Sequence, residues 1–284
     1  MSQTLISGEP ALRALDGLEM NVGFARAVVE CISDGELWCD RAEAPRAFHA
    51  VHECGMSLVW GPDVAGAFDD VVARVRERAA AGLGEWLQVE PRWTELGPDA
   101  LDWDGAFGAV PFDRCVERGG ALVDDAGRPV GVVRRTRLNF AFDAAAFGAA
   151  CGALPDGVTV RPAVEADLAW DGGTVPGHFW SDVDAFLAAG GGSVAEVDGV
   201  PAAVAFVSFR TGDDVEIGIE TVPAFRRRGL ARVACAAFLA DLVARGLVPV
   251  WSCRADNAGS LRLAESLGFA VSRRLPYYEV RAVA

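Results

Sequence analysis

The chain has 284 residues, of which 51% are hydrophobic, so it is long enough for two domains and carries ample core material. Its net charge is −14 and it contains no lysine, which excludes a Schiff-base or P-loop lysine and disfavours a nucleic-acid partner. No apolar run approaches the roughly 20 residues of a membrane span, and the start MSQTLISGEP lacks a signal-peptide pattern. We therefore expect a cytoplasmic protein that does not associate with membranes.

Residues 1–157 are expected to form an N-terminal α/β domain. The spacing of apolar residues predicts one helix over 21–33 and another over 64–81. The turn residues Asp125–Gly127 separate two strand-like runs and predict a hairpin. The segment 91–113 is rich in Trp, Gly and Asp and gives no assignment. The strands expected in this half are 37–40, 47–52, 56–60, 86–89, 121–124 and 130–138.

Residues 158–284 are expected to form a second domain, because the stretch 151–157, with its Gly and Pro residues, is typical of a boundary. Asp198-Gly199, placed between two apolar runs, is the strongest hairpin signal in the chain. Apolar residues spaced four apart predict a helix over 230–245. The other expected helices are 165–170, 182–189 and one from 257 or 260 to 268, and the expected strands are 158–162, 193–197, 200–210, 215–222, 248–253 and 277–283.

The seven cysteines are scattered and form no C-x-x-C pair, so we expect small buried side chains rather than a disulfide framework or a zinc site. His49, His52 and Cys54 form the one group to consider as metal ligands. Strand alternation places His49 on the opposite face from the other two. Ordinary packing is therefore expected, and no metal site is predicted.

The loop Arg226–Ala231 fits the pattern R-x-x-G-x-[GA] between a predicted strand and a predicted helix. At this spacing, successive backbone N–H groups can turn toward one anion at the helix N-terminus. Gly229 is needed where a side chain would block the close approach of backbone to phosphate. Three adjacent arginines, Arg226 to Arg228, add positive charge, although a solvated loop would show the same run. The loop predicts a pyrophosphate site.

Together with Asn257, Ser260 and the turn 267–269 (Leu-Gly-Phe), this segment resembles the acetyl-CoA-binding core of the GNAT superfamily of N-acyltransferases. The resemblance implies an α/β (α+β) GNAT fold over 158–284, with a central mixed, splayed β-sheet flanked by helices in the order β-α-α-β-β-β-α-β-α-β. Residues 1–157 follow a similar but looser plan without the loop, which indicates a degenerate GNAT-like half.

The resemblance also implies how acetyl-CoA, the expected co-substrate, would bind. The loop would take the CoA pyrophosphate, Asn257 would approach the pantetheine, and the acyl arm would pair with strand 215–222 through the amides of Thr221 and Val222. The expected cofactor-binding residues are Thr221, Val222, Arg226, Arg227, Arg228, Gly229, Leu230, Ala231, Arg232, Asn257 and Ser260.

Amine acylation needs a base for the ammonium proton and an acid for the departing thiolate. Ala264 stands where the family commonly carries a tyrosine acid, and Ser252 stands where some members carry a glutamate. Glu216 and Glu220 are four apart, so they share one strand face and are the candidate bases, with structural carboxylates as the alternative. Glu216 matches a catalytic glutamate of the histone-acetylating members. The candidate acids are Ser260, Tyr277, Tyr278, Cys253 and water.

The runs EIGIET (216–221), PVWSC (249–253) and SLRLAESLGF (260–269) resemble a GNAT branch that includes the zwittermicin A resistance acetyltransferase. This resemblance implies acetyl transfer to the primary amine of a small molecule, with an antibiotic or a natural-product intermediate as one class of acceptor. The acidic net charge favours such a cationic acceptor, but solubility explains the same charge. His178 could contact the acceptor, and the aromatic residues Trp170, Phe179 and Trp180 could line its pocket.

Two alternatives remain open at this point. One is an acyltransferase that uses another acyl thioester in natural-product metabolism, and the other is a non-catalytic CoA-binding regulatory protein. The missing tyrosine at Ala264 favours the non-catalytic protein, whereas the intact loop with both carboxylates favours the enzyme. Either a monomer or a homodimer is compatible with the sequence.

Overall fold

The computed structural model describes residues 8–150 and 154–282. The chain separates into two compact units, unit 1 with residues 1–137 and 274–284 and unit 2 with residues 138–273. This division differs from the boundary expected at 151–157, of which residues 151–153 lie outside the described part of the chain. The difference arises because the strands β8 (Val132–Phe142) and β15 (Phe269–Val280) each contribute residues to both units. The division at residue 157 stays a prediction.

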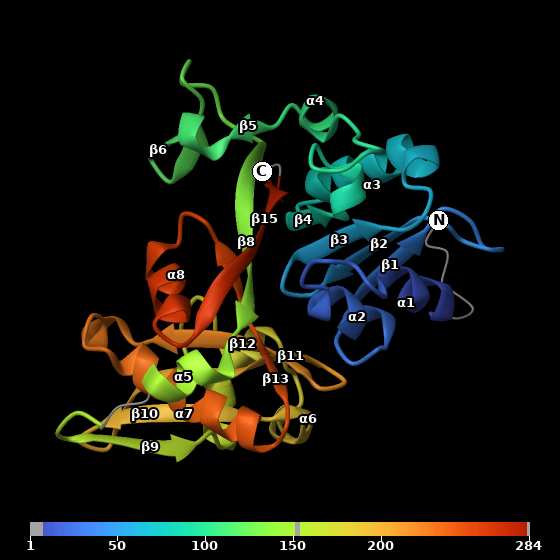
Figure 1. Cartoon of the computed structure of the whole chain (residues 1–284). Helices are drawn as coiled ribbons and strands as arrows, with labels where there is room; N and C mark the ends of the chain where they lie inside the picture. The colour runs from blue at the N-terminus through green and yellow to red at the C-terminus, as the bar shows by residue number, and fades with distance from the viewer. Residues whose placement is uncertain (1–7, 151–153, 283–284) are drawn as a thin grey trace. The chain divides into compact units, whose positions relative to one another are not determined.

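Unit 1 is built on a sheet with the strand order β1-β2-β3-β4-β15-β8 (Figure 1). The first three strands form an antiparallel meander, and β4 lies parallel to β3 after a helical crossover. Apolar side chains of the crossover helix, such as Val71 and Val75, pack against Val59 and Leu87 of the sheet. The main elements are α1 (Glu9–Leu15), α2 (Gly23–Val29), β1 (Gly35–Cys39), β2 (Phe48–His52), β3 (Met56–Trp60), α3 (Phe68–Ala80), β4 (Glu85–Val89), α4 (Trp103–Phe107), β5 (Val110–Pro111), β6 (Val116–Arg118) and β7 (Ala121–Val123).

Unit 2 contains a five-stranded sheet in the order β13-β12-β11-β10-β9. Helix α7 packs its apolar residues Leu230, Ala234, Phe238 and Leu242 into the core of this unit. The predicted Asp198-Gly199 turn is confirmed, with φ angles of 51° and 80° that suit a tight hairpin. The elements are α5 (Ala144–Ala150), β9 (Val158–Pro162), α6 (Val183–Ala189), β10 (Gly192–Val197), β11 (Val200–Thr211), β12 (Asp214–Thr221), α7 (Leu230–Ala244), β13 (Val248–Val250), β14 (Ser252–Arg254) and α8 (Ala258–Glu265).

Unit 2 follows the element order expected from the GNAT resemblance. The predicted helix 165–170 is a 3₁₀ helix, Glu165–Ala169, because the Asp167 carboxylate bonds back to the Val164 amide at 2.8 Å and closes a tight turn. The predicted strand 248–253 is interrupted at Trp251, where the chain leaves the five-stranded sheet. The expected closing strand begins earlier than residue 277, at Phe269.

The splay between strands is confirmed and is confined to unit 2. β12 pairs with β13 only from Asp214 to Glu216, and β14 then belongs to a different sheet and lies beside β8. In unit 1 the corresponding strands β3 and β4 stay paired over four residues, so the described part of that unit holds no equivalent gap. The backbone amide of Gly61, directly after β3, donates to the carboxylate of Glu90 at 2.9 Å. The described strands β3 and β4 of unit 1 therefore do not splay as β12 and β13 do, and the interpretation of this unit as a degenerate GNAT-like half stays a prediction.

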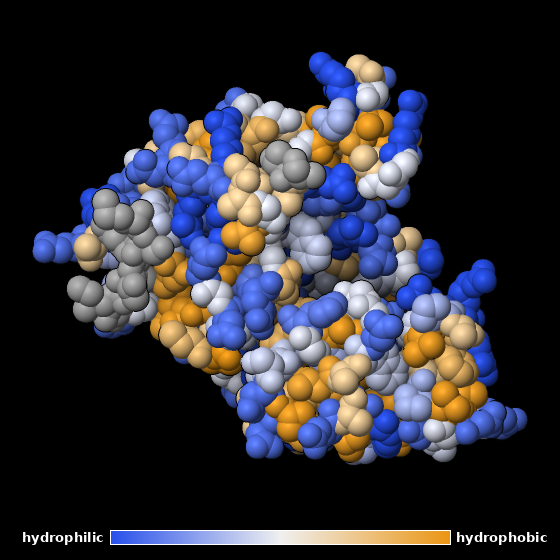
Figure 2. Space-filling view, turned by 180° about the vertical axis from the view of Figure 1, so that it is seen from behind, coloured by the Kyte–Doolittle hydropathy of each residue, from blue (hydrophilic) through white to orange (hydrophobic). Residues whose placement is uncertain are grey.

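The exposed large apolar side chains come from different elements of the chain. Figure 2 shows hydrophilic and hydrophobic residues intermixed on the face that it displays. Examples are Ile32, Trp86, Leu96, Val116, Val164, Val200 and Val248. Within the described residues, no helix is both long and apolar enough to cross a bilayer.

Candidate functional site

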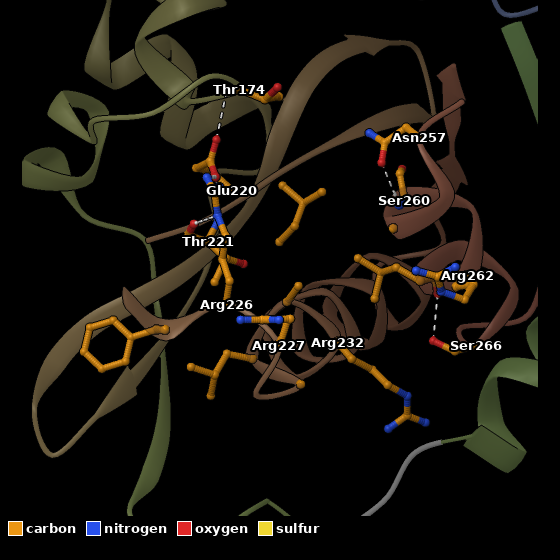
Figure 3. A pocket seen from close by; sticks show the side chains of 17 residues that line it. Thr174, Glu220, Thr221, Arg226, Arg227, Arg232, Asn257, Ser260, Arg262 and Ser266 are labelled. Atoms are coloured by element: carbon orange, nitrogen blue, oxygen red, sulfur yellow. Dashed lines mark hydrogen bonds and ion pairs between the residues drawn. The ribbon is translucent and has the colours of Figure 1, made fainter. Parts of the chain in front are cut away.

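A cavity of about 640 Å³ lies in unit 2 where the end of β12 meets the starts of α7 and α8 (Figure 3). It collects most of the residues that the sequence predicts for cofactor binding, together with several that it does not. The lining residues are Thr174, Ile219, Glu220, Thr221, Phe225, Arg226, Arg227, Gly229, Leu230, Ala231, Arg232, Asn257, Gly259, Ser260, Arg262, Leu263 and Ser266. Val222, Arg228 and Glu216 are outside this lining.

The N-terminus of α7 opens into this cavity. Gly229 precedes the helix with φ 78° and provides no side-chain cap, so the first N–H groups of the helix have no cap hydrogen bond. Arg227 also has a positive φ, 62°, which turns the backbone tightly before the helix begins. A Cβ at Gly229 would meet no heavy atom within 4 Å, so a side chain there would project into open space rather than clash. The backbone conformation is thus a second reason for glycine at this position.

The three adjacent arginines, Arg226 to Arg228, make different contacts. Arg226 donates from Nε to the Thr221 carbonyl at 3.0 Å and from Nη2 to Glu220 at 3.2 Å, so its guanidinium ties the loop to the end of β12. The Arg228 guanidinium lies 5.4 Å from the centre of the Phe225 ring. Arg227 lines the cavity, as do Arg226, Arg232 and Arg262. The cavity therefore has a cationic wall that suits an anion, and Arg228 contributes to it only at longer range.

The two backbone amides that the sequence predicts for the acyl arm, those of Thr221 and Val222, already donate hydrogen bonds within the protein. The Val222 amide donates to the Ala202 carbonyl at 2.9 Å, and the Thr221 amide donates to Glu220 at 2.9 Å. Neither N–H group is available to a thioester arm in this structure. Main-chain N–H and C=O groups alternate sides along a strand. On the side where β13 diverges, β12 must therefore offer the main-chain groups of residues other than Thr221 and Val222.

Ile219 is the residue that β12 presents to the splay. The Asp213 carbonyl accepts from Val248, and the Thr221 carbonyl accepts from Arg226, so odd-numbered residues direct their main-chain groups away from β11. By alternation, the N–H and C=O of Ile219 point the same way, beyond the last residue paired with β13. Ile219 also lines the cavity. An extended arm would find a free strand edge here.

The Glu220 carboxylate acts as a clamp, because its hydrogen bonds join the loop 173–174 to the end of β12 and to Arg226. Its Oε2 accepts from the amides of Gly173 and Thr174 at 2.9 and 3.2 Å, and its Oε1 accepts from Thr221 and Arg226 (Figure 3). Both oxygens are therefore occupied, and the side chain is 12% exposed. This geometry supports the structural alternative for Glu220 rather than the role of a base.

Glu216 lies apart from the cavity, on the same strand face as Glu220 and about 13 Å along the strand from it. It is 6% exposed, and its Oε1 accepts from the Ser252 hydroxyl at 2.7 Å across the point where β13 ends and β14 begins. The Ser208 hydroxyl donates to the Glu216 carbonyl at 3.0 Å. The strand thus brings the two glutamates to one face, as predicted, but places them in different environments.

The start of α8 supplies a capped turn and a hydroxyl. The Asn257 side-chain oxygen accepts from the Ser260 amide at 3.1 Å, which fixes the helix N-terminus. The Ser260 hydroxyl accepts from the Trp251 indole N–H at 3.1 Å. Ala264, one turn later, is fully buried. Of the other candidate acids, Tyr278 belongs to unit 1 and donates to Asp104 at 2.9 Å, and burial raises its pKa.

The predicted acceptor-side residues are divided between core and surface. Trp180 is buried and donates to the Val207 carbonyl at 2.7 Å, and the Phe179 ring packs at a tilt against Phe206 and edge-on against Phe209. Trp170 packs against the same core, whereas His178 is exposed. None of the four residues lines the cavity at α7.

The histidines of unit 1 are packed in its interior. His49 Nε2 lies 3.0 Å from Glu85 Oε2, and His52 Nδ1 accepts from the Cys54 amide at 3.0 Å. Burial lowers the pKa of His52 to about 4, although the charge of Asp34 opposes the shift. Among the described residues, no group of three or more His, Cys, Asp or Glu side chains is placed to hold a metal ion.

The sequence prediction missed several residues that line the cavity, but helical spacing could have identified one group of them. Gly259, Arg262 and Leu263 of α8 and Ser266, directly after the helix, recur at helical spacing, which identifies them once Ser260 is placed at the site. Thr174 had no such signal, because only the Glu220 contact to the distant loop places it there.

The comparisons with known proteins agree with this geometry. Residues 141–278 match the model of the GNAT acetyltransferase family. A GCN5-related N-acetyltransferase-like protein from Streptococcus suis superposes with a TM-score of 0.67 at 18% identity and covers 96% of this chain and 98% of its own. A GNAT-family acetyltransferase from Colwellia psychrerythraea has a TM-score of 0.57 at 11% identity, with 99% of both chains covered. None of the curated proteins compared with the chain matches it.

The fold, the splayed strands and the family match together define an enzyme of the acyltransferase class. The match to the GNAT acetyltransferase family covers residues 141–278, slightly less than half of the chain. At these identities the superposed structures establish the fold alone.

Proposed function

We propose that this chain is an acetyl-CoA-dependent N-acetyltransferase that acetylates the primary amine of a small molecule. The observation that carries the proposal is the cavity that joins the N-terminus of α7 to the free edge of β12 at Ile219. One end of this cavity offers helix N–H groups and arginines to a pyrophosphate, and the other offers a strand edge to an extended arm.

The residues around the cavity fit CoA. Gly229 and the backbone of Leu230, Ala231 and Arg232 would hold the pyrophosphate, with Arg227 adding charge. Ile219 would pair with the pantetheine arm in place of the Thr221 and Val222 amides, and Asn257 and Ser260 would contact the arm from α8. Arg226 and Arg228 would shape the loop through Thr221, Glu220 and Phe225.

The reaction that acetyl-CoA supplies is transfer of its acyl group from sulfur to nitrogen. The amine attacks the thioester carbonyl, the new C–N bond forms, and the C–S bond breaks with its electron pair on sulfur. Glu216 is the proposed base and takes the amine proton through water, because its carboxylate is held by Ser252 at the branch of the strands. Ser260 is the proposed hydrogen-bond donor to the sulfur, since Ala264 has no hydroxyl. Glu220 serves as the clamp described above.

The acceptor would approach from the strand face that carries Glu216. Glu220 lies on the same face and accepts hydrogen bonds from the loop 173–174, which would border the path of the acceptor. The resemblance to the zwittermicin A resistance branch suggests an antibiotic or a natural-product intermediate as acceptor. Cytoplasmic location and the choice between monomer and homodimer stay predictions from the sequence.

The proposal is tested by incubating the protein with acetyl-CoA and a panel of small primary amines. Released thiol and acetylated amine are measured together, with Gly229→Glu as the inactive control. Stoichiometric thiol and acetyl-amine support the proposal. Tight CoA binding without turnover would favour the non-catalytic alternative suggested by Ala264, and turnover restricted to longer acyl thioesters would favour the other acyltransferase.

A further inference from the structure

The indole of Trp251 is held rigidly beside the cavity. Trp251 stands between β13 and β14, at the point where the chain leaves the five-stranded sheet, and it is 2% exposed. Its backbone carbonyl accepts from Phe140 at 3.2 Å, and its ring lies 5.4 Å from that of Phe269. The indole N–H therefore has a fixed direction, and it points at the Ser260 hydroxyl at 3.1 Å.

This contact orients the Ser260 hydroxyl. A serine hydroxyl has one donor and two acceptor lone pairs, and the indole N–H occupies one lone pair. The hydroxyl proton consequently cannot point at the indole. Within residues 8–150 and 154–282, no side chain or carbonyl is recorded as accepting this proton. Since Ser260 lines the cavity, the O–H is left to donate to a bound ligand.

Ser260 also occupies a suitable place on its helix. Ser260 and Ala264 are one turn apart on α8 and share a face. Ala264 stands where the resemblance leads one to expect a tyrosine hydroxyl, and it is fully buried. Ser260 thus supplies a hydroxyl on the same helix face, one turn nearer the helix N-terminus, and Trp251 restricts its rotation.

We propose that Trp251 is a positioning residue that presents the Ser260 hydroxyl to the sulfur of the acyl thioester. The inference rests on the proposed function. As the C–S bond breaks, the electron pair stays on sulfur, and the Ser260 O–H stabilises the developing thiolate by a hydrogen bond. Serine keeps its proton throughout, and the thiolate takes the proton that the amine has lost.

A double-mutant cycle separates this role from simple packing. Ser260→Ala should lower kcat by about tenfold to a hundredfold, and Trp251→Phe by about threefold to tenfold, with KM for acetyl-CoA changed less than threefold. In the Ser260→Ala background, Trp251→Phe should have no further effect on kcat, because its action passes through the hydroxyl. The matched control is Trp180→Phe, which removes another buried indole hydrogen bond of unit 2, to Val207, away from the cavity. An effect of Trp251→Phe that persists without Ser260 would overturn the proposal.

A second readout needs binding but no turnover. Titration of CoA bound to the protein, followed by the ultraviolet absorbance of its thiolate, should show a more acidic thiol in wild type than in Ser260→Ala or Trp251→Phe. Equal thiol acidity in all three proteins would overturn the inference and leave the proposed function intact. A thiol shift in a protein that acetylates no amine would support the inference and count against the proposed function. Absence of CoA binding would overturn both.

Discussion

Replacing Gly229 by glutamate places a carboxylate at the N-terminus of α7, in the cavity and beside its arginines. Because a Cβ there meets nothing within 4 Å, the change adds charge without a clash. At a separation of about 5 Å and an effective dielectric constant of about 20, the repulsion from one phosphate charge is about 3 kcal/mol. Since about 1.4 kcal/mol is tenfold in affinity, CoA should bind at least about a hundredfold more weakly. The positive φ of 78° adds about 1–2 kcal/mol of backbone strain that lowers stability.

The control that isolates the charge is Gly246→Glu at the other end of the same helix. Gly246 has a φ of 74° and open space around a Cβ, so the backbone strain is matched. Its carboxylate would lie about 25 Å from the loop by helix length, beyond the screening distance at physiological salt. Calorimetric titration with CoA should give wild-type affinity for Gly246→Glu and a large loss for Gly229→Glu. If both variants bind CoA as tightly as wild type, the assignment of the loop is refuted.

Three further outcomes follow from the structure. Glu216→Gln should lower kcat/KM by about a hundredfold or more, since it removes the proposed base while Ser252 can still donate to the amide oxygen; unchanged turnover on the amine panel would mean that the base lies elsewhere. Glu220→Ala should lower the free energy of unfolding, measured in urea, by about 1–3 kcal/mol because four hydrogen-bond donors lose their acceptor. The control Glu265→Ala, at an exposed position, should change it by less than about 0.5 kcal/mol, and equal effects of the two variants would contradict the structural role of Glu220. The pKa of His52 is about 4 in the folded protein and about 6.5 in the unfolded chain, so the unfolded chain binds more protons between these pH values. The free energy of unfolding should therefore fall by about 2 kcal/mol from pH 7 to pH 5. This loss should be absent in His52→Asn, and identical pH slopes of stability in the two proteins would refute it.

The parts of the fold that were predictable are those in which local sequence and tertiary structure agree. The Asp198-Gly199 turn adopts positive φ angles that few other residue pairs tolerate, and the apolar stripe of α7 is buried as its period indicates. The short helices α1 and α5 were missed for local reasons, since α5 has no polar residue that would give an amphipathic period and α1 carries a proline in its first turn. The interruption at Trp251 depends on pairing with distant strands, which a continuous apolar run cannot reveal.

The cavity was predictable in its loop and less so in its hydrogen bonds. Gly229 and Asn257 could be placed because a helix N-terminus and its cap have local signatures. The Val222 amide pairs with Ala202 because strand register sets the side that each N–H faces. A shift of the register by one residue would turn the Thr221 amide, instead of the Val222 amide, toward β11. Glu220 became a clamp because the loop at Thr174 wraps around it, a contact across more than 40 residues of sequence.

Native mass spectrometry of the purified protein during titration with acetyl-CoA shows whether the cavity at α7 binds an acyl donor. A one-to-one complex should form with wild type and be lost in Gly229→Glu. If the protein binds neither acetyl-CoA, CoA nor longer acyl-CoAs, the cavity at α7 has no role in acyl transfer and the proposed function is wrong.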